Sequence, residues 1–167
     1  AGAGKQVSFV ADGSISAAGK PVILNGAGTV TPVAETSDAA GTPVVYEAAA
    51  TDYTAATFDS SSNKVVIAYQ DEGNSNYGTA IVGTVSGTSI SYGTAVAFES
   101  AESDYIAATF DSNAGKVVLA YRDQGNSGYG TAVVGTVSGT SISFGTPVVF
   151  KSANSDWISA TFDSTNN

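Results

Sequence analysis

The chain has 167 residues, 43% of them hydrophobic, and a formal net charge of −9 from 15 acidic and 6 basic residues. That length suits one domain of medium size, or a small domain beside part of a larger one. No cluster of Lys and Arg offsets the negative charge, so nucleic acid and anionic membrane surfaces are poor candidates for partners. No run of about 18 apolar residues is present that could insert into a membrane.

Two chemically important residue types are missing, because the chain contains no Cys and no His. Disulfides, thiolate or His-ligated metal sites, and Ser–His or Cys–His nucleophiles are therefore excluded. The apolar residues are mostly Val, Ala, Ile, Tyr and Phe, with Gly, Ser and Asn between them. Because β-branched and aromatic residues fit a pleated surface and the small polar residues fit turns, the composition predicts an all-β fold.

Residues 1–40 form a block of their own at the N-terminus. We expect three short strands there, at Gln6–Ala11, Pro21–Leu24 and Thr29–Val33. Asn25-Gly26 suits a tight hairpin turn, because both residues accept positive φ readily. Three short strands are marginal by themselves, so we expect this β-rich block to pack on something else, either the repeats or another chain. Residues 36–41 are predicted to be a linker.

The rest of the chain is a tandem repeat with a period of 52 residues. Repeat 1 covers residues 41–92, repeat 2 covers 93–144, and a partial third copy covers 145–167. Of the 52 positions in repeat 1, 36 are identical in repeat 2. The third copy stops at the turn from which the first two copies continue to Lys64 and Lys116, and a sheet that ended there would leave an exposed strand edge. We therefore expect the parent chain to continue, or neighbouring copies to supply the missing strands.

Each repeat is predicted to contribute four antiparallel strands. In repeat 2 these are Asp104–Asp111, Lys116–Arg122, Tyr129–Val137 and Ser141–Phe150, and in repeat 1 the last strand runs from Ser89 to Glu99. The connections are too short for crossover helices, so the strands should form a meander. Both faces of Lys64–Gln70 are apolar, which requires cover on both sides of the sheet. Four-stranded sheets with this period predict propeller blades, and a stacked array and a sandwich remain as alternatives.

Eight aspartates recur at the repeat period: Asp52, Asp59, Asp71, Asp104, Asp111, Asp123, Asp156 and Asp163. Two carboxylates can hydrolyse a glycosidic bond when they flank it. A catalytic pair is normally one asymmetric arrangement, however, whereas an acid repeated in every copy indicates a turn or a strand end. We therefore expect a protein that is not an enzyme, with no catalytic residue and no cofactor.

The turn Asp71-EGNSNYG-78 and its copy Asp123-QGNSGYG-130 form the strongest local motif. The Asp carboxylate is expected to accept hydrogen bonds from backbone N–H groups of the turn, while Gly73 or Gly125 adopts positive φ. The predicted structural turn comprises Asp71, Gly73, Asn74, Ser75, Asp123, Gly125, Asn126 and Ser127. Calcium is the alternative, but it prefers several carboxylates and the second copy offers one. No metal site is expected.

Aromatic residues also recur, several of them beside an aspartate. The candidates for contact with a glycan or receptor are Tyr53, Tyr77, Tyr105, Tyr129, Trp157, Asp52, Asp104 and Asp156. Sugar sites combine an aromatic platform with carboxylate acceptors, which keeps a carbohydrate hypothesis open. The alternative is that these rings pack between neighbouring blades.

Two parts of the repeat resemble known families. Asp123, Gly125 and Ser127 resemble the Asp-box of sialidase-type propellers, which is a structural turn in that family. The repeat text, with ISATFDS, KVVIAY, YGTAIVGTVSGTSIS and SFGTPVVF, resembles tandem repeats of marine bacteriophage structural proteins, with propeller-like, Asp-box or kelch-like blades. That resemblance covers residues 41–167 and implies tail-fibre or decoration proteins that bind rather than catalyse. The segment ADGSISAAGKPVILNGAGTVTPV is similar to β-rich anchoring segments of virion proteins.

These observations favour a virion structural protein, as a tail fibre, head fibre or capsid decoration. Its N-terminal block would attach to the particle, and its repeats would contact the host surface as a homo-oligomeric adhesion module. Near-identical repeats suit multivalent binding, because several equivalent weak sites raise avidity. The alternative is a secreted or cell-surface lectin-like propeller that binds glycans.

Overall fold

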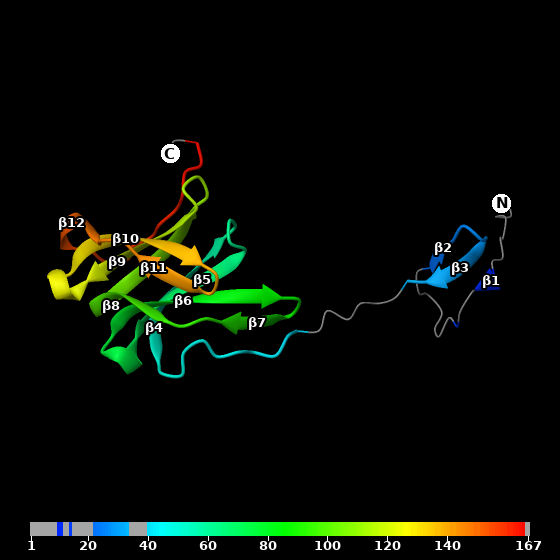
Figure 1. The fold of residues 1–167 in the computed structure, drawn as a ribbon, viewed down its shortest axis with the longest axis horizontal. Coiled ribbons are helices and arrows are strands. Elements are labelled where there is room, and N and C mark those ends of the chain that lie inside the picture. Colours follow the sequence, from blue (N-terminus) through cyan, green and yellow to red (C-terminus); the bar gives the residue numbers. More distant parts are fainter. Residues whose placement is uncertain (1–9, 12–13, 15–21, 34–39, 166–167) are drawn as a thin grey trace, which may run out of the picture. The chain divides into compact units, whose positions relative to one another are not determined.

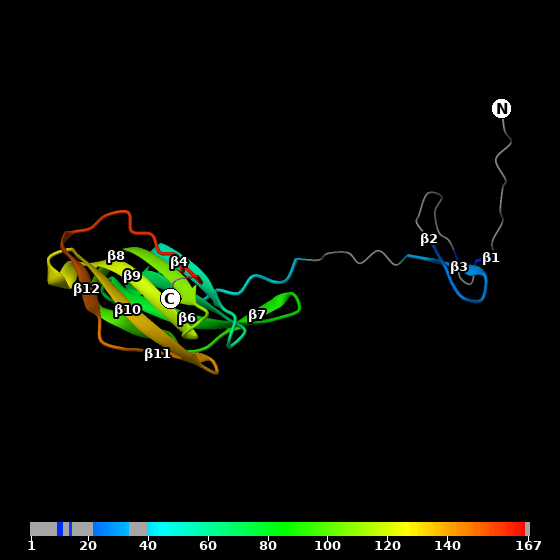
Figure 2. The same cartoon turned by 90° about the horizontal axis from the view of Figure 1, so that it is seen from above.

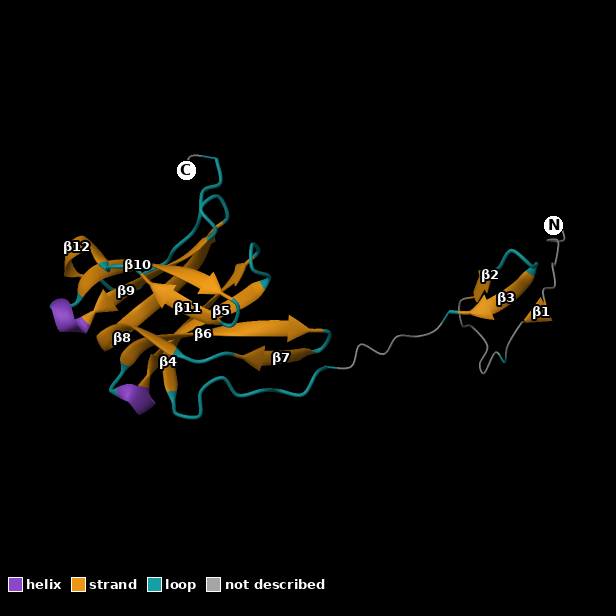
Figure 3. Ribbon diagram, viewed as in Figure 1, coloured by secondary structure: helices purple, strands orange, loops and turns teal. Residues whose placement is uncertain are grey.

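The computed structural model describes residues 10–11, 14, 22–33 and 40–165, and the chain divides into two compact units, residues 1–39 and 40–167. The described part consists of strands, turns and two short 3-10 helices (Figure 1, Figure 3). The predicted all-β class is confirmed. In the described ranges, no helix has the length and apolar character needed to cross a membrane.

The first unit contains a three-stranded sheet in the order β1-β3-β2. β1 (Val10–Ala11) runs parallel to β3 (Thr29–Pro32), and β2 (Val22–Leu24) pairs antiparallel with β3. The three predicted strands are confirmed where the structure describes them, except that β3 ends at Pro32 and not at Val33. Residues 6–9 and Pro21 lie outside the described residues. The side chains of β2 are exposed, and Val30 of β3 is buried.

The turn between β2 and β3 differs from the predicted one. Asn25 and Gly26 do not adopt positive φ, whereas Gly28 does, with φ of 77°. The side-chain oxygen of Asn25 accepts hydrogen bonds from the backbone N–H groups of Ala27 and Thr29, at 3.1 and 3.2 Å. The Asn25 side chain thus holds the turn together, and the left-handed residue is the glycine that ends it.

The second unit is an antiparallel sheet of nine strands. Its strands are β4 (Thr51–Asp59), β5 (Lys64–Asp71), β6 (Tyr77–Ser86), β7 (Ser89–Tyr92), β8 (Val96–Asp111), β9 (Lys116–Asp123), β10 (Tyr129–Ser138), β11 (Ser141–Phe144) and β12 (Val148–Asn154). Short 3-10 helices follow β5 and β9, at Glu72–Asn74 (η1) and Gln124–Asn126 (η2). The strand pairing is a meander, as predicted.

β8 joins two halves of this sheet, because its 16 residues pair with different strands at its two ends. Val96–Glu102 pair with β6, and Ser103–Asp111 pair with β9. We call β4–β7 with Val96–Glu102 sheet 1, and Ser103–Asp111 with β9–β12 sheet 2. The last strand of one sheet therefore continues directly into the first strand of the next.

The predicted strands from Ser89 to Glu99 and from Ser141 to Phe150 are wrong in their continuity. Each is broken in two at the glycine that starts a repeat, so that β7 and the first part of β8 both pair with β6. The break has a steric reason. A Cβ on Gly93 would overlap the backbone carbonyl of Thr140, which lies in the β10–β11 turn of sheet 2. Glycine lets the chain pass over that turn.

The core lies between the two sheets. One face of sheet 1 contributes Val66, Ala68, Ala80 and Val82, and the facing side of sheet 2 contributes Val117, Leu119, Tyr121, Val133 and Ile142. β4 lies against β8 and β9 across this interface (Figure 2). Strands such as β5 were predicted to be covered on both faces. A strand face is buried in this way only where the other sheet lies against it. The strands of residues 40–165 do not close into a barrel or a propeller.

Candidate functional site

Tyr53, Tyr105 and Trp157 occupy the same position in the three copies of the repeat, and their rings lie in a row. The ring centroids of Tyr53 and Tyr105 are 5.0 Å apart, and those of Tyr105 and Trp157 are 5.2 Å apart. The planes are tilted by 53° and 51°. We call these three residues the aromatic row. Tyr53 and Trp157 are exposed, and Tyr105 between them is half-buried.

The backbone takes an unusual conformation at each member of the row. Tyr53, Tyr105 and Trp157 have φ of 49°, 48° and 56°, a region that aromatic residues rarely adopt. The pairing register of β4 and of β8 shifts at the same place, just after Asp52 and Asp104. A bulge of this kind redirects a side chain. The strain recurs in every copy, and it turns one ring from each copy onto the ring of its neighbour.

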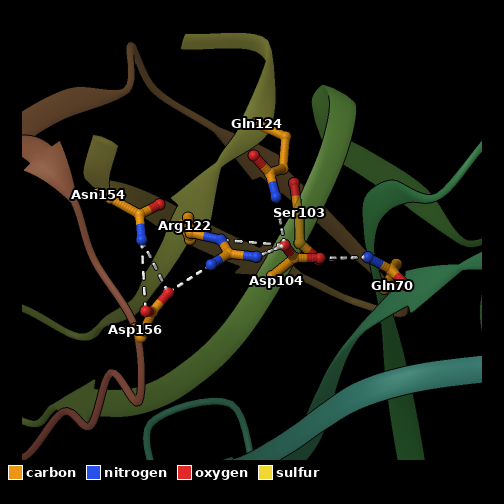
Figure 4. A network of polar contacts seen from close by, with 7 residues as sticks. All are labelled: Gln70, Ser103, Asp104, Arg122, Gln124, Asn154 and Asp156. Atoms are coloured by element: carbon orange, nitrogen blue, oxygen red, sulfur yellow. Dashed lines mark hydrogen bonds and ion pairs between the residues drawn. The ribbon is translucent and has the colours of Figure 1, made fainter. Parts of the chain in front are cut away.

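The carboxylate of Asp104, beside the row, is buried and fully engaged (Figure 4). Gln70 of sheet 1 donates its side-chain N–H to Asp104 Oδ1 at 2.7 Å and to the Ser103 carbonyl at 3.1 Å. Arg122 donates from Nε, at 3.0 Å, and from Nη2 to Asp104 Oδ2, which also accepts from Gln124 Nε2 at 2.8 Å. A buried charge with this many donors is well stabilised.

Gln70 links the first copy of the repeat to Asp104 of the second, and Arg122 links the second copy to Asp156 of the third in the same way. The two residues are equivalent in the repeat, and Arg122 Nη1 forms an ion pair with Asp156. Its guanidinium also lies 4.6 Å from the centroid of the Tyr105 ring. Burial alone would lower the pKa of Arg122, but hydrogen bonds and charge from Asp104 and Asp156 outweigh it and raise that pKa. Each copy is thereby linked to the next by a polar contact beside the row.

The exposed part of this arrangement is at its third-copy end. Trp157 is 85% exposed, and the side chain of Asp156 is partly exposed and accepts hydrogen bonds from the Asn154 amide at 3.3 Å. An open ring with a carboxylate and an amide beside it offers stacking together with hydrogen-bond acceptors and donors. The described residues enclose no pocket, so such binding would take place on a surface.

The structure places the predicted contact residues in three different situations. Tyr53, Tyr105, Trp157, Asp104 and Asp156 come together at the row. Asp52 is exposed at the first-copy end of the row. The carboxylate of Asp104 is unavailable to a ligand, because the donors described above already occupy it. The two other tyrosines are not part of the row: Tyr77 and Tyr129 lie half-buried at the starts of β6 and β10, paired with Asp71 and Asp123.

The Asp-Gly-Asn-Ser turns follow the prediction only in part. Asp123 accepts a hydrogen bond from the backbone N–H of Asn126 at 3.2 Å, but the side chain of Asp71 does not cap its turn. The prediction of positive φ at Gly73 and Gly125 is wrong, because that conformation occurs at Ser75-Asn76 and Ser127-Gly128. Glycine is needed for space instead: a Cβ on Gly73 would press against Ala49. In the described ranges, no group of three acidic side chains is arranged to hold a metal ion.

Sequence reasoning missed the linking residues Gln70, Arg122, Gln124 and Asn154. One signal was present, because the strand KVVxAY ends in a long polar side chain in both repeats, Gln in one and Arg in the other. The partners lie 34 residues further along the chain in both cases, which a local pattern does not indicate. No family model, curated protein or solved structure matches the chain.

Proposed function

We propose that the chain is a non-enzymatic structural protein of a virion, as a tail fibre, head fibre or capsid decoration protein. Residues 1–40 attach it to the particle, and the repeats form a propeller-like adhesion module that contacts the host surface. The aromatic row is the observation that carries this proposal. One ring per copy, placed at the same left-handed backbone position and in contact with the next ring, is a regularly repeated feature. Repeated weak contacts suit adhesion through avidity.

The ligand class that best fits the row is a surface glycan. Trp157 presents an open ring for stacking, with Asp156 and Asn154 beside it, and Tyr53 with Asp52 offers a similar pair at the other end. Aromatic rings with a polar rim are enriched where a site must combine apolar contact with hydrogen bonds. The avidity of such a site rises with the number of repeats presented together.

The roles of the other aspartates support a structural protein rather than a hydrolase. Asp59 accepts four hydrogen bonds from the backbone and hydroxyl groups of Ser61 and Ser62. Asp111 accepts two from the backbone of the equivalent turn. These carboxylates hold the turns that join neighbouring strands, and Asp104 links two sheets. A repeated structural task explains why the acids recur at the repeat period.

A glycan array and a host-cell binding assay test the adhesion part of the proposal. We expect Trp157→Ala to weaken binding by about tenfold or more, since it removes the most exposed ring of the row. Phe58→Ala is the matched control, because Phe58 is an exposed aromatic residue that is not a member of the row. Equal losses for both variants would contradict the row as the binding surface, and circular dichroism would establish that each variant is folded.

A secreted or cell-surface lectin is the second candidate, and the same exposed ring beside a carboxylate favours it. The two functions differ in where the protein is found. Mass spectrometry of purified particles should detect the chain at a fixed ratio to the capsid protein if it is a virion component. Glycan binding by a chain that is missing from purified particles would instead identify the lectin.

A further inference from the structure

The exposed large hydrophobic residues of the second unit fall into two groups along the chain. Of the described residues from 40 onward, one group belongs to sheet 1 and the segment leading into it: Val44, Val45, Tyr53, Phe58 and Val85. The other group belongs to sheet 2 and the segment that follows it: Val134, Val148, Val149, Phe150 and Trp157. We call the first group the entry face and the second group the exit face. Ten exposed large apolar side chains are unusual for a surface that stays in water.

The exit face is the repeat equivalent of the surface that sheet 1 buries against sheet 2. Phe150 corresponds to Phe98, and the two are 56% and 6% exposed. Val148 corresponds to Val96, which packs against the core. The side chains that form the joint inside the chain are therefore present again on the exit face, without a sheet to cover them.

Two residues of the entry face are in turn the equivalents of residues that sheet 2 buries against sheet 1. Phe58 corresponds to Phe110 and Val85 to Val137, and both residues of sheet 2 pack against the core. In sheet 1 the same positions are exposed. One chain thus carries both halves of a joint that it already forms once internally.

Two specific contacts of the internal joint, a ring contact and a glycine contact, have unoccupied counterparts at the exit face. Phe98 packs on Tyr121 and Phe144, with ring centroids 5.0 and 5.8 Å apart. Phe150, its equivalent, is left uncovered. Gly93 lies against the Thr140 turn, whereas Gly145 has only the Val134 carbonyl of its own sheet nearby, 3.8 Å from where a Cβ would be. In the internal joint, a pair of rings covers the equivalent of Phe150, and a turn lies against the equivalent of Gly145.

Sheet 1 carries these complements. Its Tyr69 and Tyr92 correspond to Tyr121 and Phe144 of sheet 2, and Tyr46 of the same chain packs on them with centroids 5.2 and 6.1 Å away. The Thr88 turn of sheet 1 corresponds to the Thr140 turn and lies against Gly41. The segment 41–59 at the entry face is therefore the equivalent of 145–163 at the exit face.

We propose that the exit face of one copy binds the entry face of a second copy of this chain, head to tail, and so repeats the joint between sheets 1 and 2. The equivalent segments 41–59 and 145–163 compete for one place in this contact. Residues 156–163 share Asp-aromatic-x-x-Ala-Thr-Phe-Asp with β4, and residues 155–162 lie outside the strands. Residues 156–163 take the place of β4 beside β5 of the second copy, so that equivalent elements are exchanged between the two copies.

Sedimentation velocity over a range of concentrations tests this proposal. The wild-type chain should increase in mass with concentration. An exit variant, Val134→Asp with Phe150→Asp, and an entry variant, Val85→Asp, should each associate about tenfold more weakly or not at all. These residues are exposed, so the folds should persist, which circular dichroism would verify. A wild-type chain that stays monomeric at every concentration overturns the proposal.

Mixing the two variants separates a head-to-tail contact from other modes. The exit variant keeps an intact entry face and the entry variant keeps an intact exit face, so the mixture should form dimers and stop there. If the entry variant alone associates as well as wild type, the contact joins two exit faces and the proposal is wrong. Ile23→Asp in the first unit is the control. Loss of association in that variant would assign the contact to residues 1–39 and would also overturn the proposal.

Discussion

Sheets 1 and 2 have nearly the same sequence and bury different residues. Val82 and Val134 are the same amino acid at the same position of β6 and β10, yet they are 0% and 46% exposed. The difference lies in their surroundings. Sheet 2 covers Val82, whereas Val134 lies on the face of sheet 2 that is exposed. Burial in a repeat protein is therefore a property of the stack of repeats, since each one covers the next.

The same comparison holds for charged residues. Asp52 and Asp104 start the same bulge in β4 and β8, but Asp52 is exposed and Asp104 is buried. Asp104 is buried because Gln70 reaches it from the preceding sheet, and Arg122 and Gln124 satisfy its remaining oxygen. One residue type at one position thus has two electrostatic environments, which substitution can tell apart.

The largest effect should come from the aspartates at the bulge. We expect Asp104→Ala to lower the free energy of unfolding by about 3 kcal/mol, because it leaves Gln70 and Arg122 without their shared acceptor. Asp52→Ala should change it by less than about 0.5 kcal/mol, as at an ordinary surface site. Urea unfolding followed by circular dichroism measures both. Equal losses would mean that the network in Figure 4 does not stabilise the joint.

The two valines should give the next largest difference. Val82→Ala removes buried methyl groups from the core and should cost about 2 kcal/mol. Val134→Ala should cost less than about 0.5 kcal/mol in dilute solution, where the exit face is in water. Thermal and urea unfolding at low and high protein concentration would compare them. A cost for Val134→Ala that grows with concentration would sharpen the comparison, because it would show that a second copy covers this residue.

The smallest effect concerns the turns after β4 and β8. Burial alone would raise the pKa of Asp59, but hydrogen bonds from Ser61 and Ser62 outweigh it and lower that pKa. A carboxyl whose pKa is lower in the folded chain stabilises it above the unfolded pKa, and this contribution disappears as the pH falls through the folded pKa. Asp59→Asn should therefore cost about 1 kcal/mol near neutral pH and progressively less below about pH 4.

Asp111→Asn is the matched variant for this turn. Asp111 accepts two backbone hydrogen bonds, whereas Asp59 accepts two from the backbone and two from hydroxyl groups. We expect about half the loss seen for Asp59→Asn, because fewer donors lose their acceptor. Unfolding free energies from pH 3 to pH 7 would test both variants. A loss for Asp59→Asn that stays constant across this range would contradict the assigned role of its hydrogen bonds.

Much of the strand pattern could be predicted from local sequence. Lys116–Arg122 and Tyr129–Val137 were predicted to within one residue of β9 and β10, because alternating Val, Ala and Tyr between turn residues is a strong signal. The breaks at Gly93 and Gly145 were not predicted. A glycine in a strand pattern indicates a bulge or a close approach, and the Thr140 turn that approaches Gly93 lies far along the chain.

The candidate site was predictable as a set of residues and not as an arrangement. The recurrence of Asp-Tyr, Asp-Tyr and Asp-Trp at the 52-residue period identified the members of the row. Their left-handed backbone was not expected, because aromatic residues disfavour it. It is maintained by contacts between copies, namely the ring contacts of the row and the polar links from Gln70 and Arg122.

By itself, the sequence determined the all-β class, the repeat period and the positions of most strands, since these depend on residue type and on contacts along the chain. Only the tertiary structure decided that β8 is shared by two sheets, that Asp104 is buried while Asp52 is exposed, and that one valine is in the core while its identical copy is in water. The physical reason is that hydrophobic burial and charge pairing are set by what lies across an interface, and two nearly identical repeats can have different neighbours.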